Sequence, residues 1–348
     1  MTHRVALHTT WLLLGCALLA YLAMTRGALP IGAEQFWQVL AGHGASNVKL
    51  IVLEWRLPRV LMALLIGAAL GVSGAIFQSL LRNPLGSPDI LGFNTGAYSG
   101  VLVALVLFNQ GIAAMTGAAL VGGIGTAALV YLFAWRNGVE TFRLIIVGIS
   151  VRALLMALNA WLIISASLES ALSAGLWSAG SLNGITWAKT PPVIGVLLLS
   201  LLLMALLTRR MRLLEMGDDT ASALGVPVER SRLLLMLIGV VLTAASTALV
   251  GPISFVALLA PQIARRLGGG EKGALLLAAL WGALFLFAAD FAAPPLSLPY
   301  QFPVGATTVS LGGSYLSALL LREAPPLCSL SPHRCICQAS SSATTNRC

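Results

Sequence analysis

Two polar residues inside an apolar run are the first candidates for chemistry. Arg152 and Asn159 lie within residues 143–166, a stretch of mostly apolar side chains. Gly148 and Leu155 share one helical face with them, at spacings of 4, 3 and 4 residues. An ionisable group is costly in lipid, so it usually faces a cavity or a partner. A water-accessible pathway would explain Arg152 and Asn159 together, and so would a structural hydrogen-bond network within a helix bundle.

A second face carries small residues. Gly67, Gly71, Gly74 and Gln78 follow one another at spacings of 4, 3 and 4 residues, so they also lie on one side of a helix. Small residues let helices approach closely in lipid, where packing replaces the hydrophobic effect. The pattern is typical of ordinary helix packing. It also fits helices that line and reshape a pathway, and both interpretations stay open at this point.

A short polar segment, 209–230, has its own helix start and stop signals. Asp218 is a good N-cap residue, and Asp219 is favourable in the first turn. Gly225 fits the position after the helix end, and Pro227 suits the start of the next helix. The sequence therefore predicts a rigid helix of about two turns. Such a helix could insert into a groove of a soluble partner, or it could be a connector at the membrane interface.

The motifs of common enzymes are missing. The chain has no G-x-x-x-x-G-K-[ST] phosphate loop, no H-E-x-x-H and no G-x-S-x-G. Its four histidines are scattered, and four of its five cysteines fall in the last 21 residues without a zinc-like spacing. We therefore expect no intrinsic enzyme activity, no cofactor and no metal site.

The composition indicates whether these residues lie in water or in lipid. Hydrophobic residues make up 58% of the 348 residues and charged residues only 9%, against about 25% charged in an ordinary soluble domain. A soluble enzyme, a nucleic-acid-binding domain and a disordered protein are all disfavoured. The apolar runs do not alternate as in a β-barrel. The chain is thus expected to be an all-α polytopic membrane protein in contact with lipid, with no nucleic-acid partner.

About ten transmembrane helices are expected from run length and punctuation. The predicted spans are 10–28, 58–81, 91–108, 113–134, 143–166, 192–208, 231–250, 252–267, 273–291 and 304–321. The first is interpreted as a retained helix because no clear signal cleavage site follows it. With both termini inside, inner segments hold 15 of the 21 Lys and Arg residues and outer segments hold 5. This asymmetry favours cytoplasmic termini.

Three longer segments lie outside the predicted spans. They are the outer stretch 29–57, the inner segment 209–230, and 167–191, whose Trp and polar residues suit an outer interface. We expect one transmembrane domain over residues 1–323. Residues 324–348 are polar and rich in Ser and Cys, a composition typical of disorder.

Four ordered motifs resemble one family. They are GAALGVSG with Gln78, RNPL and PDILG; EMGDD with ALG; GPISFV with AP and RR; and PVG with LG. Over roughly residues 10–323 the chain resembles the FecCD permeases, membrane subunits of iron-siderophore and vitamin B12 ABC importers. The resemblance implies the type II ABC importer permease architecture in a bacterial inner membrane. One departure is Gln262, where many relatives carry His.

The resemblance also implies partners. These are a homologous second permease subunit forming a heterodimer, two cytoplasmic ATP-binding subunits, and a periplasmic ferric-siderophore-binding protein. A coupling helix near 215–226 would contact the ATPases through Glu215, Gly217, Asp218, Asp219, Thr220, Leu224 and Gly225. Arg56 and Arg59 fall where family members can offer arginines to acidic residues of the binding protein. Contact with lipid phosphates is the alternative for these two arginines.

Two segments of the chain bear on the identity of the transported substrate. Segments such as WRLPRVLMALLIGAALGVSG and FRLIIVGISVRALL are similar to the branch that imports ferric enterobactin. Another siderophore or a corrinoid is the alternative within the same importer class. A different class, an ion-coupled secondary transporter, would use Arg152 and Asp290 as coupling residues. The scarcity of intramembrane acids and the capped inner helix count against it.

Overall fold

The computed structural model describes residues 3–27, 29–108, 112–136, 141–268, 273–296 and 302–323. Within these ranges the chain is helical and contains no β-strand, which confirms the all-α prediction. The elements are α1 (His3–Thr25), α2 (Ala33–Leu40), α3 (Ser46–Lys49), π-helical η1 (Leu50–Arg56), α4 (Leu57–Leu80), α5 (Phe93–Leu102), π-helical η2 (Val103–Leu107), α6 (Ile112–Ala134), α7 (Thr141–Ser165), α8 (Leu168–Ser178), α9 (Thr190–Glu215), α10 (Asp218–Ala223), α11 (Val228–Val250), α12 (Val256–Gly268), α13 (Ala274–Leu296) and α14 (Val304–Glu323). The predicted tail, 324–348, lies outside the described residues.

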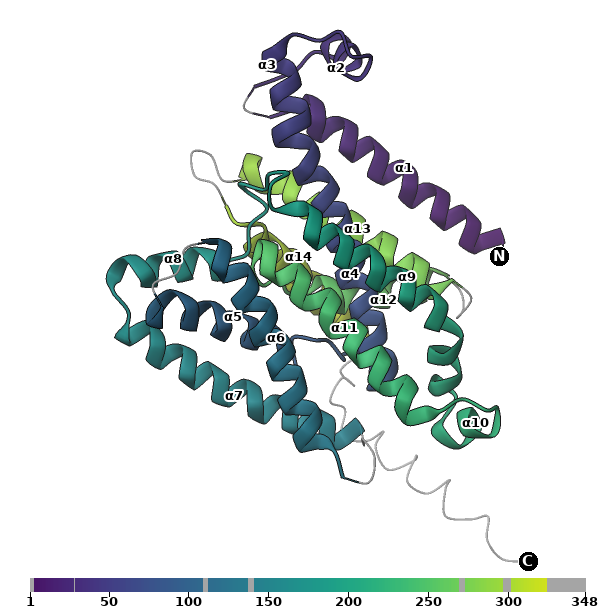
Figure 1. Cartoon of the computed structure of the whole chain (residues 1–348). Coiled ribbons are helices and arrows are strands. Elements are labelled where there is room, and N and C mark those ends of the chain that lie inside the picture. The colour runs from purple at the N-terminus through teal and green to yellow at the C-terminus, as the bar shows by residue number, and fades with distance from the viewer. Residues whose placement is uncertain are drawn as a thin grey trace, which may run out of the picture.

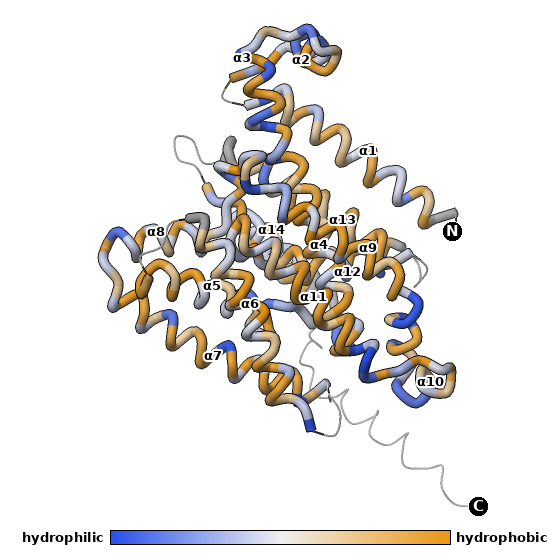
Figure 2. The backbone as a smooth tube through the Cα atoms, in the orientation of Figure 1, coloured by the Kyte–Doolittle hydropathy of each residue, from blue (hydrophilic) through white to orange (hydrophobic). Residues whose placement is uncertain are grey.

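Every one of the ten predicted spans holds a helix. Among the described residues, seven helices are long and apolar enough to cross a membrane: Val5–Thr25, Ser46–Leu80, Ala114–Ala134, Thr141–Ser165, Thr190–Glu215, Val228–Val250 and Ala274–Ala293. The other three predicted spans hold α5 with η2, α12 and α14, which are shorter or less apolar. Figure 2 shows apolar residues along most of the helical rods.

Two helix boundaries differ from the prediction. The rod that contains α4 begins at Ser46, where the sequence suggested a start at Pro58. Pro58 occupies the first turn of α4, where its missing N–H is least costly. The wider hydrogen bonding of η1 joins this turn to the helix before it. At the other end of the molecule, α9 runs to Glu215 instead of ending at residue 208. Arg209, Arg210 and Arg212 are too polar for the lipid, but they are favourable in a helix that continues into water.

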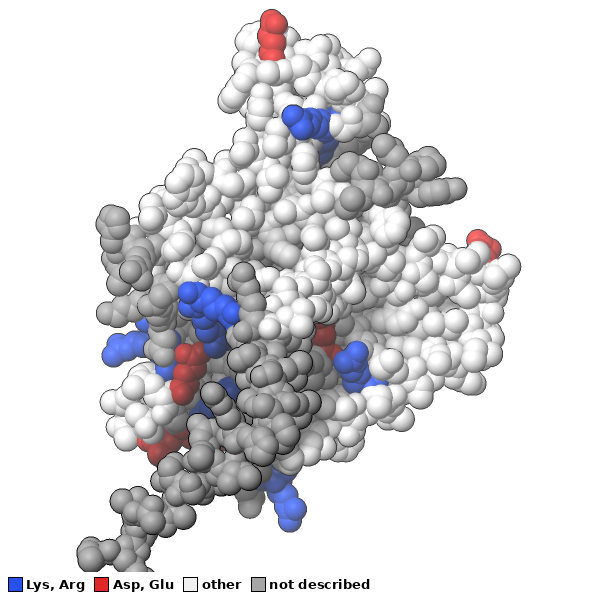
Figure 3. All heavy atoms as spheres, turned by 180° about the vertical axis from the view of Figure 1, so that it is seen from behind, with Lys and Arg blue, Asp and Glu red and all other residues white. Residues whose placement is uncertain are grey.

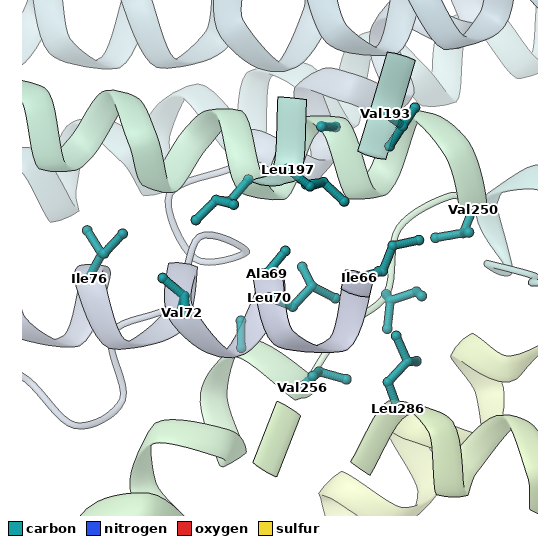
Figure 4. Packing of buried hydrophobic residues seen from close by; sticks show 14 of the residues in the cluster. Ile66, Ala69, Leu70, Val72, Ile76, Val193, Leu197, Val250, Val256 and Leu286 are labelled. Atoms are coloured by element: carbon teal, nitrogen blue, oxygen red, sulfur yellow. The ribbon is translucent and has the colours of Figure 1, made fainter. Parts of the chain in front are cut away.

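Helix α4 is the central element of the bundle, and most of its residues are buried. It packs against α9, α11, α12 and α13. Figure 4 shows Ile66 and Leu70 of α4 among apolar side chains that include Leu197 of α9 and Leu286 of α13. Burial on all sides explains why α4 carries both large apolar residues and the glycine face.

The predicted glycine face is a packing surface inside this chain. A Cβ at Gly67 would overlap the carbonyl oxygen of Gly282, and one at Gly71 would overlap that of Ala278, both on α13. A Cβ at Gly74 would overlap the carbonyl oxygen of Ala257 on α12. The structure therefore favours the packing interpretation over the pathway interpretation for these three glycines.

The two ends of the bundle differ. Helices α2 and α3 stand at one end and α10 at the opposite end (Figure 1). The segment 167–191 forms α8 and a turn leading to α9, and the indole of Trp187 donates to the carbonyl oxygen of Leu53 at 2.8 Å. Seen from behind, charged side chains gather mainly towards the end with α10, below a broad uncharged band (Figure 3). This arrangement matches a body that crosses lipid.

Candidate functional site: the α10 helix, the α4–α5 turn and a polar pocket

Helix α10 occupies the predicted position of the coupling helix, with one correction. The N-cap is Gly217, whose φ of 117° favours glycine, and Asp218 is the first helical residue instead of the cap. Asp219 lies in the first turn as expected. Leu224 is the C-cap and is followed by Gly225 at φ 79°, which confirms the predicted stop signal.

Asp218 does not cap α10 because its carboxylate is bound elsewhere. Arg82 donates to Asp218 Oδ1 at 2.7 Å, and Arg232 donates to Asp218 Oδ2 at 2.8 Å. Arg82 also donates to the carbonyl oxygen of Leu214, and Arg232 also pairs with Glu229. One carboxylate thus ties α10 to α11 and to the turn after α4. Sequence reasoning missed both arginines, since 136 positions separate Arg82 from Asp218.

The outward face of α10 is open. Asp219, Thr220 and Gly225 are exposed, Leu224 is 59% exposed, and Ala221 points inward and is buried. Of the predicted coupling residues, the structure thus gathers most on one small convex surface. Glu215, at the end of α9, is half-buried beside it.

The turn between α4 and α5, residues 81–92, is held on a second side by α12. Gln262 donates from Nε2 to the carbonyl oxygen of Pro84 at 2.8 Å. Gln78 donates to the carbonyl oxygen of Leu258 at 2.9 Å and accepts from Arg265 at 2.5 Å. Gln262 therefore has a structural task in this chain. Gln78 belongs to the same network.

A polar pocket of about 390 Å³ contains both polar residues of the α7 face. Arg152 and Asn159 line it together with Asn94, Thr95 and Tyr98 of α5. The pocket is also lined by Asp89, Pro252 and Ser254, which belong to the non-helical segments before α5 and α12. The structure thus places Arg152 and Asn159 on one cavity, consistent with the shared helical face that their spacing predicted.

The hydrogen bonds in this pocket are incomplete. Asn94 donates to Asp89 and accepts from Thr247 at 2.8 Å. Arg152 Nε and Asn159 Oδ1 are buried with no hydrogen-bond partner. Burial raises the pKa of the Asp89 carboxyl to about 6, and the nearby Arg152 and Asn94 oppose that rise. Two residues of the pocket lining, Arg152 and Asn159, therefore each keep one buried polar atom without a partner.

Arg56 and Arg59, the predicted docking residues, are both engaged within the chain. Arg59 makes a two-pronged ion pair with Asp290, with Nε to Oδ2 at 2.9 Å and Nη2 to Oδ1 at 2.8 Å. Arg56 donates to the carbonyl oxygens of Met24 at 2.6 Å and Leu29 at 2.5 Å. Asp290, the candidate coupling acid of the rival transporter class, is thus neutralised by Arg59.

Among the described residues, no group of three or more His, Cys, Asp or Glu side chains could hold a metal ion. The four cysteines of the tail lie outside the described ranges.

Comparison with known proteins agrees with this geometry. The model of the FecCD transport family matches residues 13–322. The ferric enterobactin transport system permease protein FepG of Escherichia coli (strain K12) is 61% identical over 93% of this chain and 98% of its own length. The achromobactin transport system permease protein CbrC of Dickeya dadantii (strain 3937) is 38% identical, over 88% of this chain and 90% of its own.

A solved structure has the same fold. It is described as an inward-facing conformation of a metal-chelate type ABC transporter. It covers 90% of this chain and 98% of its own, with a TM-score of 0.82 and 28% identity. The family model spans all four motifs, and the solved structure shares the helical bundle. The chain therefore belongs to the FecCD transport family.

Proposed function

We propose that this chain is a permease subunit of an ATP-driven importer that moves a ferric siderophore, ferric enterobactin in the first instance, across the bacterial inner membrane. The observation that carries this proposal is the 61% identity to the E. coli ferric enterobactin permease over nearly the full length of both chains. Identity falls to 38% for the achromobactin permease, so the enterobactin assignment has the stronger support.

The complex contains further subunits. A homologous permease pairs with this chain as a heterodimer, two cytoplasmic subunits bind and hydrolyse ATP, and a periplasmic protein delivers the ferric siderophore. This chain makes and breaks no covalent bond. Both termini lie in the cytoplasm, a topology supported by the 15 to 5 distribution of Lys and Arg between inner and outer segments. Helices α2, α3 and α8 then face the periplasm.

Transport occurs by alternating access, with α10 as the contact to the ATPases. ATP binding shifts α10, and the spans α9 and α11 on either side of it re-pack. The exposed Leu224 inserts into an ATPase groove, and the ion pairs of Asp218 carry the displacement to α11 and to the α4–α5 turn. Small displacements become discrete changes because packed helices have few alternative arrangements.

Docking of the binding protein uses the outer end of α4, where Arg56 and Arg59 lie. Arg59 is 32% exposed at its side chain although it is paired with Asp290. An acidic residue of the binding protein can therefore still contact it from outside. Charge reversal at both arginines should weaken docking in nanodiscs, more at low salt than at high salt. If the variant and the unmodified chain bind the binding protein with equal affinity at both salt concentrations, Arg56 and Arg59 do not take part in docking.

Radio-iron uptake from ferric enterobactin tests the function directly. The chain is expressed in cells that lack only their own copy of this permease subunit. Restored uptake that disappears when the partner ATPase is inactivated is the expected result. Uptake that persists without the ATPase would instead support an ion-coupled transporter. Failure despite confirmed membrane insertion would point to another siderophore, and a chain ending at Glu323 controls for interference by the tail.

A further inference from the structure

The polar pocket between α5 and α7 has a composition that packing does not explain. Arg152 lies near the middle of the 25-residue α7, where a charge is costly unless it faces water or a partner. Asn159, two turns further along, is 95% buried and its Oδ1 accepts no hydrogen bond. Arg152 Nε is likewise buried and without a partner. Most buried polar atoms in proteins have a hydrogen-bond partner, so two unpaired atoms around one cavity point to a bound group that completes them.

Irregular backbone reaches this pocket from two directions. Gly92 ends the α4–α5 turn at φ 84°, and a Cβ there would lie 2.9 Å from the Cβ of Arg152. The non-helical segment before α12 contributes Pro252 and Ser254 to the same lining. Non-helical backbone at membrane depth is tolerated only where protein buries it or where it lines a water-filled cavity. Pro252 and Ser254 border this cavity, as the second case requires.

One wall of the pocket is aromatic. Tyr98 of α5 lines the cavity, and its ring stacks on Trp177 of α8 at 5.9 Å between centroids and 7° between planes. The stack with Trp177 holds the Tyr98 ring in one orientation. A cation at Arg152, an aromatic face at Tyr98 and an amide acceptor at Asn159 therefore surround one space.

We propose that this pocket is a subsite on the translocation path that holds one catecholate arm of the ferric siderophore. The anionic phenolate oxygens meet Arg152, the ring lies against Tyr98, and an amide N–H of the arm donates to Asn159 Oδ1. The phenolates, the ring and the amide of the arm thus each have a complementary residue in the pocket. This inference rests on the proposed function and names a site for its substrate.

Asp89 is a positioning residue in this arrangement. Its carboxylate accepts from Asn94 and lines the same cavity as Arg152, so it supplies a negative charge that can orient the guanidinium. The turn that carries Asp89 also contains Arg82, which is paired with Asp218 of α10. The nucleotide state of the ATPases can therefore alter the pocket through this turn.

A protection experiment tests the subsite without relying on turnover. Met156 lines the pocket and Leu154 does not, although both are well exposed on α7. Each is replaced by cysteine, as Met156→Cys or Leu154→Cys, in a chain whose five native cysteines are changed to serine. The assembled complex in nanodiscs is then treated with a thiol reagent with and without ferric enterobactin.

Ferric enterobactin should slow labelling at position 156 at least fivefold and leave position 154 unchanged. A neutral ferric hydroxamate should protect neither position, because it lacks the anionic aromatic arm. Equal labelling of position 156 with and without ferric enterobactin would overturn the proposal. Protection of position 156 by the hydroxamate as well would also overturn it, because occupancy would not depend on catecholate chemistry.

Uptake by pocket variants gives a second readout. Arg152→Ala should lower the uptake rate about tenfold to a hundredfold, since hydrogen bonds to charged groups contribute that much. Arg152→Lys should retain part of the rate, and Tyr98→Leu should lower it without removing a charge. Arg143→Ala, at the inner end of the same helix, is the matched control and should transport normally.

The experiments distinguish an error in the proposed function from an error in the subsite. If the unmodified chain does not import ferric enterobactin, the proposed function is wrong and the subsite falls with it. If the unmodified chain transports but the pocket variants transport equally well and position 156 is unprotected, only the subsite is wrong. Should Arg152→Ala fail to insert, the protection experiment and Tyr98→Leu still decide.

Discussion

Asp218 at the start of α10 accepts a 2.7 Å hydrogen bond from Arg82 in the turn after α4, although 136 positions separate them. The other oxygen of the same carboxylate accepts from Arg232 of α11. The proposed contact with the ATPases is therefore linked to two structures at once. The pair with Arg232 holds α10 against α11. The pair with Arg82 links α10 to the α4–α5 turn, which reaches the polar pocket.

Breaking the Asp218 pair should uncouple ATP hydrolysis from transport. Asp218→Asn in the assembled importer should lower siderophore uptake severalfold while basal ATPase activity persists, because the amide cannot hold two guanidinium groups. Uptake and ATPase activity are measured in the same proteoliposomes. Glu169→Gln on α8 is the control, since this carboxylate is exposed and lies outside the predicted coupling residues. The idea fails if the two variants keep the same ratio of uptake to hydrolysis.

A double-mutant cycle of Arg82→Met with Asp218→Asn measures this coupling. Both side chains of the pair are nearly half-exposed, so its contribution to stability should be at most about 1 kcal/mol. The effect on uptake should be larger than the effect on stability and strongly non-additive. Additive effects on uptake would show that the two residues act independently.

The Arg59–Asp290 pair should stabilise the outer half of the bundle. Arg59→Met would leave the carboxylate of Asp290 buried without its partner, at a cost of about 3 kcal/mol. Thermal unfolding of the purified chain, followed by size-exclusion fluorescence, should shift to lower temperature. The double variant Arg59→Met/Asp290→Leu should recover most of the loss, because an apolar pair leaves no unpaired charge. Arg26→Met, at an exposed position, is the control.

Enlarging the glycine face of α4 should disrupt packing within the chain. Gly74→Val would force its side chain into the carbonyl oxygen of Ala257 on α12, at a cost of about 1–3 kcal/mol or more. The yield of folded protein and its unfolding temperature should both fall. Gly195→Val on α9 is the matched control, since nothing lies within 4 Å of a Cβ there. Equal behaviour of the two variants would contradict the observed α4–α12 contact.

What the sequence could predict is what depends on local patterns. Apolar run length predicted ten helices because a membrane demands such runs, and the capping residues predicted α10 to within one residue. The contacts of single charged residues could not be predicted. Asp218 looks like an N-cap when only its neighbours are considered, and only the fold brings Arg82 and Arg232 to it. Arg56 and Arg59 looked free for docking because Met24, Leu29 and Asp290 are distant in sequence.

The glycine face shows a different limit. Spacing places Gly67, Gly71 and Gly74 on one side of a helix, but it cannot say whether that side meets another helix or a pathway. Contacts with α12 and α13 decide in favour of packing. For Arg152 and Asn159 the same spacing argument leads to a cavity. Identical patterns therefore have opposite outcomes, depending on which helices lie alongside.

Substitution of Leu224 should separate partner binding from folding. Leu224→Glu places a charge on an apolar side chain that is 59% exposed at the end of α10. Membrane insertion and unfolding temperature should be unchanged because the side chain supports no internal packing. Co-purification of the ATPase subunits should fall at least tenfold, because burying an unpaired carboxylate in an interface is strongly unfavourable.

Ala223→Glu is the matched control: it adds the same charge at the neighbouring exposed position. A specific groove contact requires that position 224 be the more sensitive of the two. Equal losses at both positions would indicate general electrostatic repulsion instead, and no loss at either would remove α10 as the contact between this chain and its ATPases.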